Sequence, residues 1–261
     1  MAYADLKAGR FHYKDTGGDL PAVVFSHGFL MDHEMFESQV AALASQYRCI
    51  AWDQRGHGLT EVRGKHSFWD SAADVGELLD SIGVGRFFHV GMSQGGFIGL
   101  RVALNMPDRV RGLIFIDSQA GQEDPNATPM YEAMVQAWVA GQERENLVET
   151  VAQIICGPNT DHGFWTSRWL GLDPDVVPVI FETLTTREDL HNRLSEITCP
   201  ALVIHGTEDT AIPFERARAL AKGLRAGDVV QVEGAGHSAN LADPLTVNHA
   251  IKDFLTAHAG I

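Results

Sequence analysis

The sequence predicts an α/β protein with a mostly parallel sheet covered by helices on both faces. Two observations carry this prediction. Short apolar runs of strand length alternate with segments of helical periodicity, and each run ends at glycine or a polar residue. Strands that are apolar throughout are buried on both faces, as in parallel sheets with helical layers. At 261 residues the chain fits one domain, or one domain with an insertion.

Six apolar runs are the predicted strands of this sheet. They cover residues 22–25, 48–52, 86–90, 110–116, 201–204 and 228–232. An earlier segment around residues 11–14 alternates more and ends at Gly17 and Gly18. This pattern predicts the start of an antiparallel hairpin at the edge of the sheet.

Five segments between these runs carry apolar residues at helical spacing. They cover residues 35–45, 69–81, 94–105, 213–224 and 244–258. Pro213 and Pro244 suit the first turns of the last two helices, and Asp243 is suited to cap the final one.

The alternation stops between residues 120 and 193. This stretch has no strong strand pattern and instead holds five prolines and many aromatic residues on helix-like patterns. An insertion at the carboxyl end of a strand lies above the sheet, where ligands bind in open α/β folds. We therefore predict a core of residues 1–119 and 194–261, interrupted by a helical insertion, residues 120–193.

Composition excludes several classes of partner. Lys and Arg together number 20 and Asp and Glu number 34, which gives a formal net charge of −14. Such a charge disfavours polyanions, so we expect no nucleic-acid partner. No apolar stretch reaches the ~18 residues that a membrane span needs, so we expect no membrane partner. The sequence leaves the oligomeric state open.

Cysteine usage indicates the compartment. Cys49, Cys156 and Cys199 are widely spaced, and this odd, sparse set fits a reducing environment rather than a disulfide framework. The first residues lack a basic stretch followed by an apolar run, so we expect no signal peptide. The prediction is a cytoplasmic protein.

One motif carries the predicted chemistry: Gly91-Met-Ser-Gln-Gly95, between a predicted strand and a predicted helix. In that context G-x-S-x-G forms a sharp turn that exposes the serine hydroxyl. The glycines leave room for strand and helix to approach closely. The helix then points its free N–H groups and positive dipole end at the serine, where an oxyanion would form. Ser93 is therefore the predicted nucleophile.

A serine hydroxyl needs an adjacent base, and the base needs an acid to orient it. His237 follows the last predicted strand and Asp209 follows the one before it. Both positions share the sheet edge of Ser93, and the chain order serine, acid, histidine is the order expected on this architecture. Asp209 is the predicted acid. Its neighbour Glu208 and the strand-ending Asp117 are the alternatives.

These motifs together resemble the landmarks of the α/β-hydrolase superfamily, in order along nearly the whole chain. The landmarks are His27-Gly28, Asp53-Gln-Arg-Gly-His-Gly58, Gly91-Met-Ser-Gln-Gly-Gly96, His205-Gly-Thr-Glu-Asp209 and Gly236-His237. The resemblance implies an α/β-hydrolase fold with a helical cap over residues 120–193. It also implies an oxyanion hole formed by the backbone N–H groups of Phe29 and Gln94. Among subgroups the sequence is most similar to small cytosolic esterases and lactonases of the 3-oxoadipate enol-lactonase and haloperoxidase-like kind.

Two departures from the wider family narrow the chemistry. Phe29 follows His27-Gly28, where the cofactor-free haloperoxidases and arylesterases often carry tryptophan, which disfavours a perhydrolase. The nucleophile is serine rather than the aspartate that haloalkane dehalogenases and epoxide hydrolases need.

Other polar residues of the landmarks are expected to be structural. Residues 27–33 weakly resemble a metallo-hydrolase His-x-His-x-Asp-His pattern, but Phe29 stands where a ligand is required, so no metal is predicted. We expect four residues to brace the loop beside the oxyanion hole: His27, Asp53, Arg55 and His57.

The expected function is hydrolysis of a small apolar ester or lactone through an acyl-enzyme, without a cofactor. Three alternatives stay open: a hydrolase of carbon–carbon bonds in ring-cleavage diketones, a cofactor-free perhydrolase, and a non-catalytic binding member of the fold. Which residues bind the substrate is not predicted, because the fold sets the class of chemistry and the insertion sets the substrate.

Overall fold

A computed structural model describes residues 2–157 and 160–260 of the chain. Within these residues one eight-stranded sheet has the order β1-β2-β4-β3-β5-β6-β7-β8. The strands are β1 (Ala2–Leu6), β2 (Gly9–Asp15), β3 (Ala22–Ser26), β4 (Arg48–Trp52), β5 (Phe87–Met92), β6 (Val110–Ile116), β7 (Ala201–Gly206) and β8 (Val230–Val232). Strands β4 to β8 of that order run parallel, which confirms the predicted sheet.

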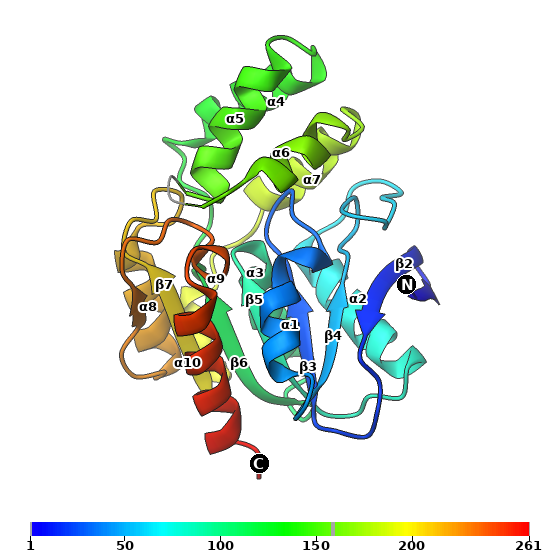
Figure 1. Cartoon of the computed structure of the whole chain (residues 1–261), viewed down its shortest axis with the longest axis vertical. Coiled ribbons are helices and arrows are strands. Elements are labelled where there is room, and N and C mark those ends of the chain that lie inside the picture. The colour runs from blue at the N-terminus through cyan, green and yellow to red at the C-terminus, as the bar shows by residue number, and fades with distance from the viewer. Residues whose placement is uncertain (1, 158–159, 261) are drawn as a thin grey trace.

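Helices cover both faces of the sheet (Figure 1). They are α1 (Glu37–Leu43), α2 (Phe68–Ser81), α3 (Gln94–Asn105), α8 (Phe214–Leu224), α9 (Ala239–Ala242) and α10 (Pro244–Ala257). Val23 and Phe25 of β3 share one apolar cluster with residues of α1 and α10. Val24, between them, belongs to a second cluster with residues of α2, α3 and α8. Successive strand residues thus face opposite helical layers, which requires the continuous apolar runs seen in the sequence.

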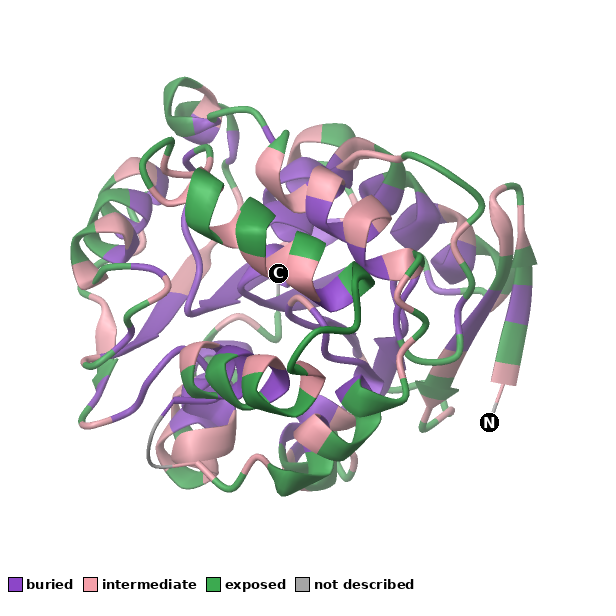
Figure 2. Ribbon diagram, turned by 90° about the horizontal axis from the view of Figure 1, so that it is seen from above, coloured by how far each residue is buried: buried purple, intermediate pink, exposed green. Residues whose placement is uncertain are grey.

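The burial pattern agrees with this layering. Figure 2 shows buried strands in the middle of the molecule, between helices that are buried on their inner faces and exposed on their outer faces. None of the helices in the described part of the chain has both the length and the apolar character that a membrane crossing demands.

The amino-terminal hairpin differs from the prediction. Its two strands are β1 and β2, so its turn lies at Lys7 and Ala8 rather than at Gly17 and Gly18. Strand β2 then pairs antiparallel with β4. Gly17 and Gly18 instead start the connection to β3, which is not a neighbour of β2 because β4 lies between them. The alternation of polar and apolar residues identified a strand of the edge hairpin but not its partner, since β1 is the edge strand and β2 lies between β1 and β4.

The first predicted helix begins as a 3-10 turn, η1 (His33–Phe36), before α1 continues it. The Asp32 side chain caps this turn by accepting the N–H of Glu34. At the other end of the chain, Asp243 caps α10 by accepting the N–H of Thr246, as predicted.

Among the described residues between β6 and β7 there are four helices. Figure 1 shows them above the carboxyl ends of the parallel strands. They are α4 (Thr128–Val139), α5 (Arg144–Ile155), α6 (Gly163–Leu170) and α7 (Val176–Thr185), and a 3-10 turn, η2 (His191–Glu196), precedes β7. The described residues of this stretch contain no strand. Trp169 of α6 connects the insertion to the loop after β3. Its Nε1 donates to the carbonyl of Leu30 at 2.7 Å. The division into core and insertion at residues 119 and 194 stays a prediction.

Candidate active site

Ser93 lies in the sharp turn between β5 and α3, with φ of +50°. Non-glycine residues seldom adopt a positive φ, and such strain persists only where the surroundings hold it. The flanking glycines explain how it is held. A Cβ on Gly95 would lie 1.9 Å from the carbonyl oxygen of Ser26, and one on Gly91 would lie 2.3 Å from the Gly95 carbonyl. Only glycine at both positions allows the helix to begin this close to the strands.

The structure brings the three predicted side chains together. His237 Nε2 lies 2.9 Å from Ser93 Oγ, and His237 Nδ1 lies 2.8 Å from Asp209 Oδ2. The other oxygen of Asp209 accepts the N–H groups of Ala211 and Ile212 at 2.8 and 2.9 Å. All three side chains belong to residues that are no more than 9% exposed. A hydroxyl, an imidazole and a fixed carboxylate in line are the arrangement that activates a serine.

Burial and neighbouring charges shift the pKa values of His237 and Asp209 in opposite directions. Burial alone would lower the pKa of His237, but the charge and hydrogen bond of Asp209 outweigh it and raise that pKa above the ordinary value. Burial alone would raise the pKa of Asp209, but His237 and His205 hold it well below the usual range. Asp209 is therefore a carboxylate at neutral pH, positioned to stabilise the imidazolium form of His237.

Asp117, the alternative acid, contacts backbone groups of the neighbouring loops. Its carboxylate accepts the N–H of Gly206 at 2.8 Å and the N–H of Ala239 at 2.7 Å. Within the described residues no hydrogen bond joins it to His237. Burial raises the pKa of Asp117 to about 7. Asp117 thus joins the loops that carry Asp209 and His237.

The second histidine of this region, His205, had no role in the sequence prediction. Its Nε2 lies 2.8 Å from the carbonyl of Ile212 and 3.2 Å from Asp209 Oδ2. A donor on Nε2 therefore supports the same oxygen of Asp209 that faces His237. The signal was present in the sequence, since His205 begins the motif that ends at Asp209. Its position four residues before Asp209 did not reveal the contact, because the intervening residues leave the strand and turn back.

The Phe29 and Gln94 N–H groups, predicted to form the oxyanion hole, donate to no protein acceptor within residues 2–157 and 160–260. Gln94 is the first residue of α3, so its free N–H points from the helix N-terminus. Its side chain donates to Gln54 Oε1 at 2.8 Å, and the Gln54 amide donates to the carbonyl of His27 at 2.6 Å. These contacts fix the loop before Phe29 relative to the turn at Ser93.

Backbone groups hold two histidines, His27 in the loop after β3 and His57 in the loop after β4. His27 Nδ1 lies 2.8 Å from the Gly28 carbonyl, and its Nε2 accepts the N–H of Gln54 at 3.0 Å. Burial lowers the pKa of His27 to about 4 and that of His57 to about 3, so both rings are neutral near pH 7. His57 Nδ1 donates to the Arg55 carbonyl at 2.9 Å. Neutral rings here add no charge beside a developing oxyanion.

A buried cluster of His12, His33 and Asp53 has donor atoms close enough together to hold a metal. The Asp53 oxygens are already engaged, by Nδ1 of His12 at 2.8 Å and Nδ1 of His33 at 2.7 Å. The backbone N–H groups of His33 and Leu59 add two further hydrogen bonds to the same carboxylate. The cluster therefore braces the segment between β3 and α1, which contains Phe29. Arg55 braces the neighbouring loop through an ion pair with Asp74 at 2.6 Å.

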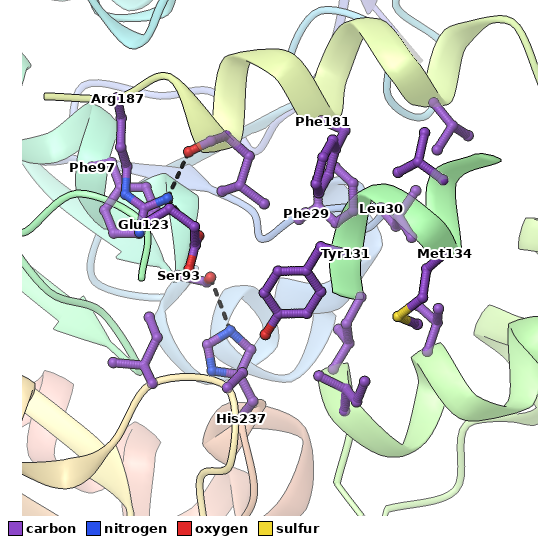
Figure 3. Close-up of a pocket in the computed structure, with 18 of the residues that line it drawn as sticks. Phe29, Leu30, Ser93, Phe97, Glu123, Tyr131, Met134, Phe181, Arg187 and His237 are labelled. Carbon is purple, nitrogen blue, oxygen red and sulfur yellow. Dashed lines mark hydrogen bonds and ion pairs between the residues drawn. The ribbon is translucent and has the colours of Figure 1, made fainter. Parts of the chain in front are cut away.

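A pocket opens onto Ser93 and His237 beneath the insertion (Figure 3). Most of its wall is apolar and comes from α4, α5 and α7. The apolar residues from these helices include Met134, Val135, Trp138, Val151, Val177 and Phe181. The core contributes Phe29 and Leu30 from the loop beside β3. Sequence reasoning predicted an apolar pocket but not its members, because their contacts depend on how the four helices pack.

Comparison with known proteins identifies the family. Residues 21–244 match the family model described as alpha/beta hydrolase fold. A protein provisionally named carbamate hydrolase RutD, from Rhizobium rhizogenes, is 27% identical over 96% of this chain and 99% of its own length. The crystal structure of the enol-lactonase from Burkholderia xenovorans is 25% identical, with a TM-score of 0.87 over 98% of this chain and 100% of that one. A thermophilic esterase from Thermogutta terrifontis is also 25% identical, with a TM-score of 0.85 over 98% of both chains. The chain therefore belongs to the alpha/beta hydrolase fold family and is a hydrolase.

Proposed function

We propose that this protein is a serine hydrolase that cleaves carboxylic esters or lactones through an acyl-enzyme intermediate. The observation that carries the proposal is the continuous line of contacts from Ser93 Oγ through His237 to Asp209. Two of the similar structures are named as an esterase and an enol-lactonase, which supports a substrate with an ester or lactone bond. The carbamate named for another relative also presents a carbonyl carbon to a nucleophile.

The proposed reaction has two halves. His237 takes the Ser93 proton as Oγ attacks the carbonyl carbon, and the oxyanion accepts the free N–H groups of Phe29 and Gln94. His237 then donates the proton to the leaving alkoxide. In the second half His237 activates a water that releases the acid and restores Ser93. No cofactor takes part in either half.

The pocket supports a small or medium-sized apolar substrate. Its wall is mostly apolar, and the polar groups converge near Ser93 and His237. We propose that the insertion, residues 120–193, acts as a cap that covers the acyl or ring portion of the substrate. We also propose a cytoplasmic location, because sparse and unpaired cysteines such as Cys49, Cys156 and Cys199 suit a reducing compartment.

The test compares wild type with Ser93→Ala for acid release from p-nitrophenyl butyrate, a plain γ-lactone and a phenyl carbamate. We expect wild type to hydrolyse at least one of them and Ser93→Ala to lose that activity. Covalent labelling by an organophosphonate should likewise require Ser93. Labelling that persists in Ser93→Ala would contradict the assignment of the nucleophile.

Other outcomes point to the alternatives. Turnover of a ring-cleavage dienol without turnover of esters would indicate a carbon–carbon bond hydrolase acting with the same residues. Peracid formation from acetate and peroxide would indicate a perhydrolase. Absence of both turnover and labelling would indicate a binding protein, against which the intact line of Ser93, His237 and Asp209 argues.

A further inference from the structure

Two oppositely charged side chains interrupt the apolar wall of the pocket. Glu123 and Arg187 line the same cavity as Ser93, and their carboxylate and guanidinium groups lie 2.9 Å apart. In the view of Figure 3 they lie at the upper left, while Phe181, Leu30 and Met134 lie to the right. The pocket therefore has an apolar part and a part that carries an ion pair.

The Arg187 side chain is almost fully buried, with 2% of it exposed. Its Nε donates to the carbonyl of Gly121 at 3.0 Å, and its Nη1 donates to the carbonyl of Leu184 at 2.6 Å. The guanidinium carbon lies 4.3 Å from the ring centre of Phe97, which is on α3 just after Ser93. These contacts fix a cation in the pocket wall against Phe97, which lies one helical turn after Ser93.

An unpaired buried guanidinium in such a wall would bind the carboxylate of a substrate strongly, because two parallel N–H groups match two carboxylate oxygens. Here Glu123 takes that place. Its other oxygen accepts the N–H of Asp124 at 3.1 Å, so the carboxylate is held from both sides. A substrate carboxylate would have to displace Glu123 or lie beside it, and both cost free energy.

We propose that Glu123 is a specificity residue that neutralises Arg187 and thereby selects esters or lactones without a net charge. This inference rests on the proposed function and deepens it. The substrate class is an uncharged molecule with an apolar chain for the α4–α7 wall and a polar group for the ion pair. The net charge of −14 acts in the same direction, since it lowers the local concentration of anions.

The test uses three esters of equal length that end in a methyl, a carboxylate or a trimethylammonium group. One set carries the terminal group on the acyl chain and a second set carries it on the alcohol. We expect wild type to prefer the methyl-terminated ester. In Glu123→Gln the ratio of kcat/KM for the anionic ester to that for the neutral ester should rise about tenfold, because Arg187 loses its counter-charge.

Arg187→Gln should shift the preference in the opposite direction, towards the cationic ester. The double variant Glu123→Gln/Arg187→Gln should return the anionic-to-neutral ratio to the wild-type value. Glu188→Gln is the matched control, since Glu188 pairs with Arg101 at 2.7 Å and is 49% exposed, away from the pocket lining. It removes the same charge next to Arg187 in the chain and should leave the ratio unchanged.

An unchanged ratio in Glu123→Gln, or an equal change in Glu188→Gln, would overturn the inference while leaving the proposed function in place. If wild type hydrolyses neither these esters nor the γ-lactone, the proposed function fails and the inference fails with it. If it hydrolyses only the lactone, inhibition of that reaction by pentanol and pentanoate decides. A purely structural ion pair would lower the melting temperature of Glu123→Gln without moving the ratio. If that variant does not fold, inhibition of wild type decides. Pentanol should inhibit at least about tenfold better than pentanoate, and equal inhibition would contradict the inference.

Discussion

The carboxylate of Asp117 accepts the backbone N–H of Ala239, two residues after His237, at 2.7 Å. Its second oxygen accepts the N–H of Gly206, three residues before Asp209. Asp117 is fully buried, so each of these hydrogen bonds forms in a medium that screens charge poorly. One carboxylate at the end of β6 thus holds together the loops that follow β7 and β8. The relative position of the predicted acid and base depends on it.

We expect Asp117→Asn to weaken the fold more than the chemistry. An amide accepts one of the two N–H groups and presents its own NH2 to the other, which costs about 2 kcal/mol of unfolding free energy. Urea unfolding measures that loss. Because Asp209 and His237 keep their own contact, kcat should fall far less than in an Asp209 variant. Loss of activity without loss of stability would instead give Asp117 a direct catalytic role.

Asp209→Asn should lower kcat by about 10³ to 10⁴, since an amide favours the wrong tautomer of the histidine and cannot balance its positive charge. The measurement is turnover of whichever ester wild type prefers. Glu208→Gln is the matched control: Glu208 is exposed and adjacent in the chain, so its activity should stay near wild type. Near-normal turnover by Asp209→Asn would shift the acid to Asp117 or Glu208.

The pH dependence of kcat/KM follows from the environment of His237. The base must be neutral to accept the Ser93 proton, so kcat/KM rises with pH through the pKa of His237 in the free enzyme. The carboxylate of Asp209 raises that pKa, so the midpoint should lie above the ordinary histidine value of about 6.5. In Asp209→Asn the charge and hydrogen bond that oppose burial most strongly are gone, so the pKa of His237 falls and the midpoint of the residual activity should move to lower pH. A profile measured from about pH 5 to about pH 9 locates the wild-type midpoint and shows whether the midpoint of the variant lies below it.

The sequence predicted the central sheet because the runs at β3, β4 and β6 are mostly apolar without alternating, a pattern typical of strands between two helical layers. It placed Ser93, Asp209 and His237 at one sheet edge by the same reasoning, since parallel strands end on one side. The partner of β2 was not predictable, because pairing across the chain does not follow from alternation. The Glu123–Arg187 pair was also missed. Its members are 64 residues apart, and only the packing of the insertion brings them together.

Gly95→Ala should disrupt the turn at Ser93. The new methyl group would lie 1.9 Å from the Ser26 carbonyl oxygen and 3.0 Å from that of His27, so the start of α3 has to move away from β3. We expect a loss of about 3 kcal/mol of unfolding free energy and of all measurable turnover. Gly85→Ala is the matched control, because nothing lies within 4 Å of a Cβ at that position. Calorimetry and ester turnover of both variants measure the difference.

Tyr131 of α4 brings a hydroxyl group to the pocket. It points toward His237 in Figure 3, and no described residue forms a hydrogen bond with it. Burial raises the pKa of this phenol, with a further contribution from Glu123, so it remains a proton donor at neutral pH. We expect this donor, which faces His237 from α4, to stabilise the leaving oxygen of the substrate.

Tyr131→Phe should therefore lower kcat/KM by about fivefold to tenfold, the value of one hydrogen bond of about 1 kcal/mol. The loss should be larger for an ethyl ester than for a p-nitrophenyl ester, because a poor leaving group depends more on a donor in the transition state. Tyr47→Phe controls for removal of a hydroxyl in the core, away from the pocket lining. An equal loss for both esters would mean that Tyr131 only shapes the pocket, because a purely steric role is indifferent to the leaving group.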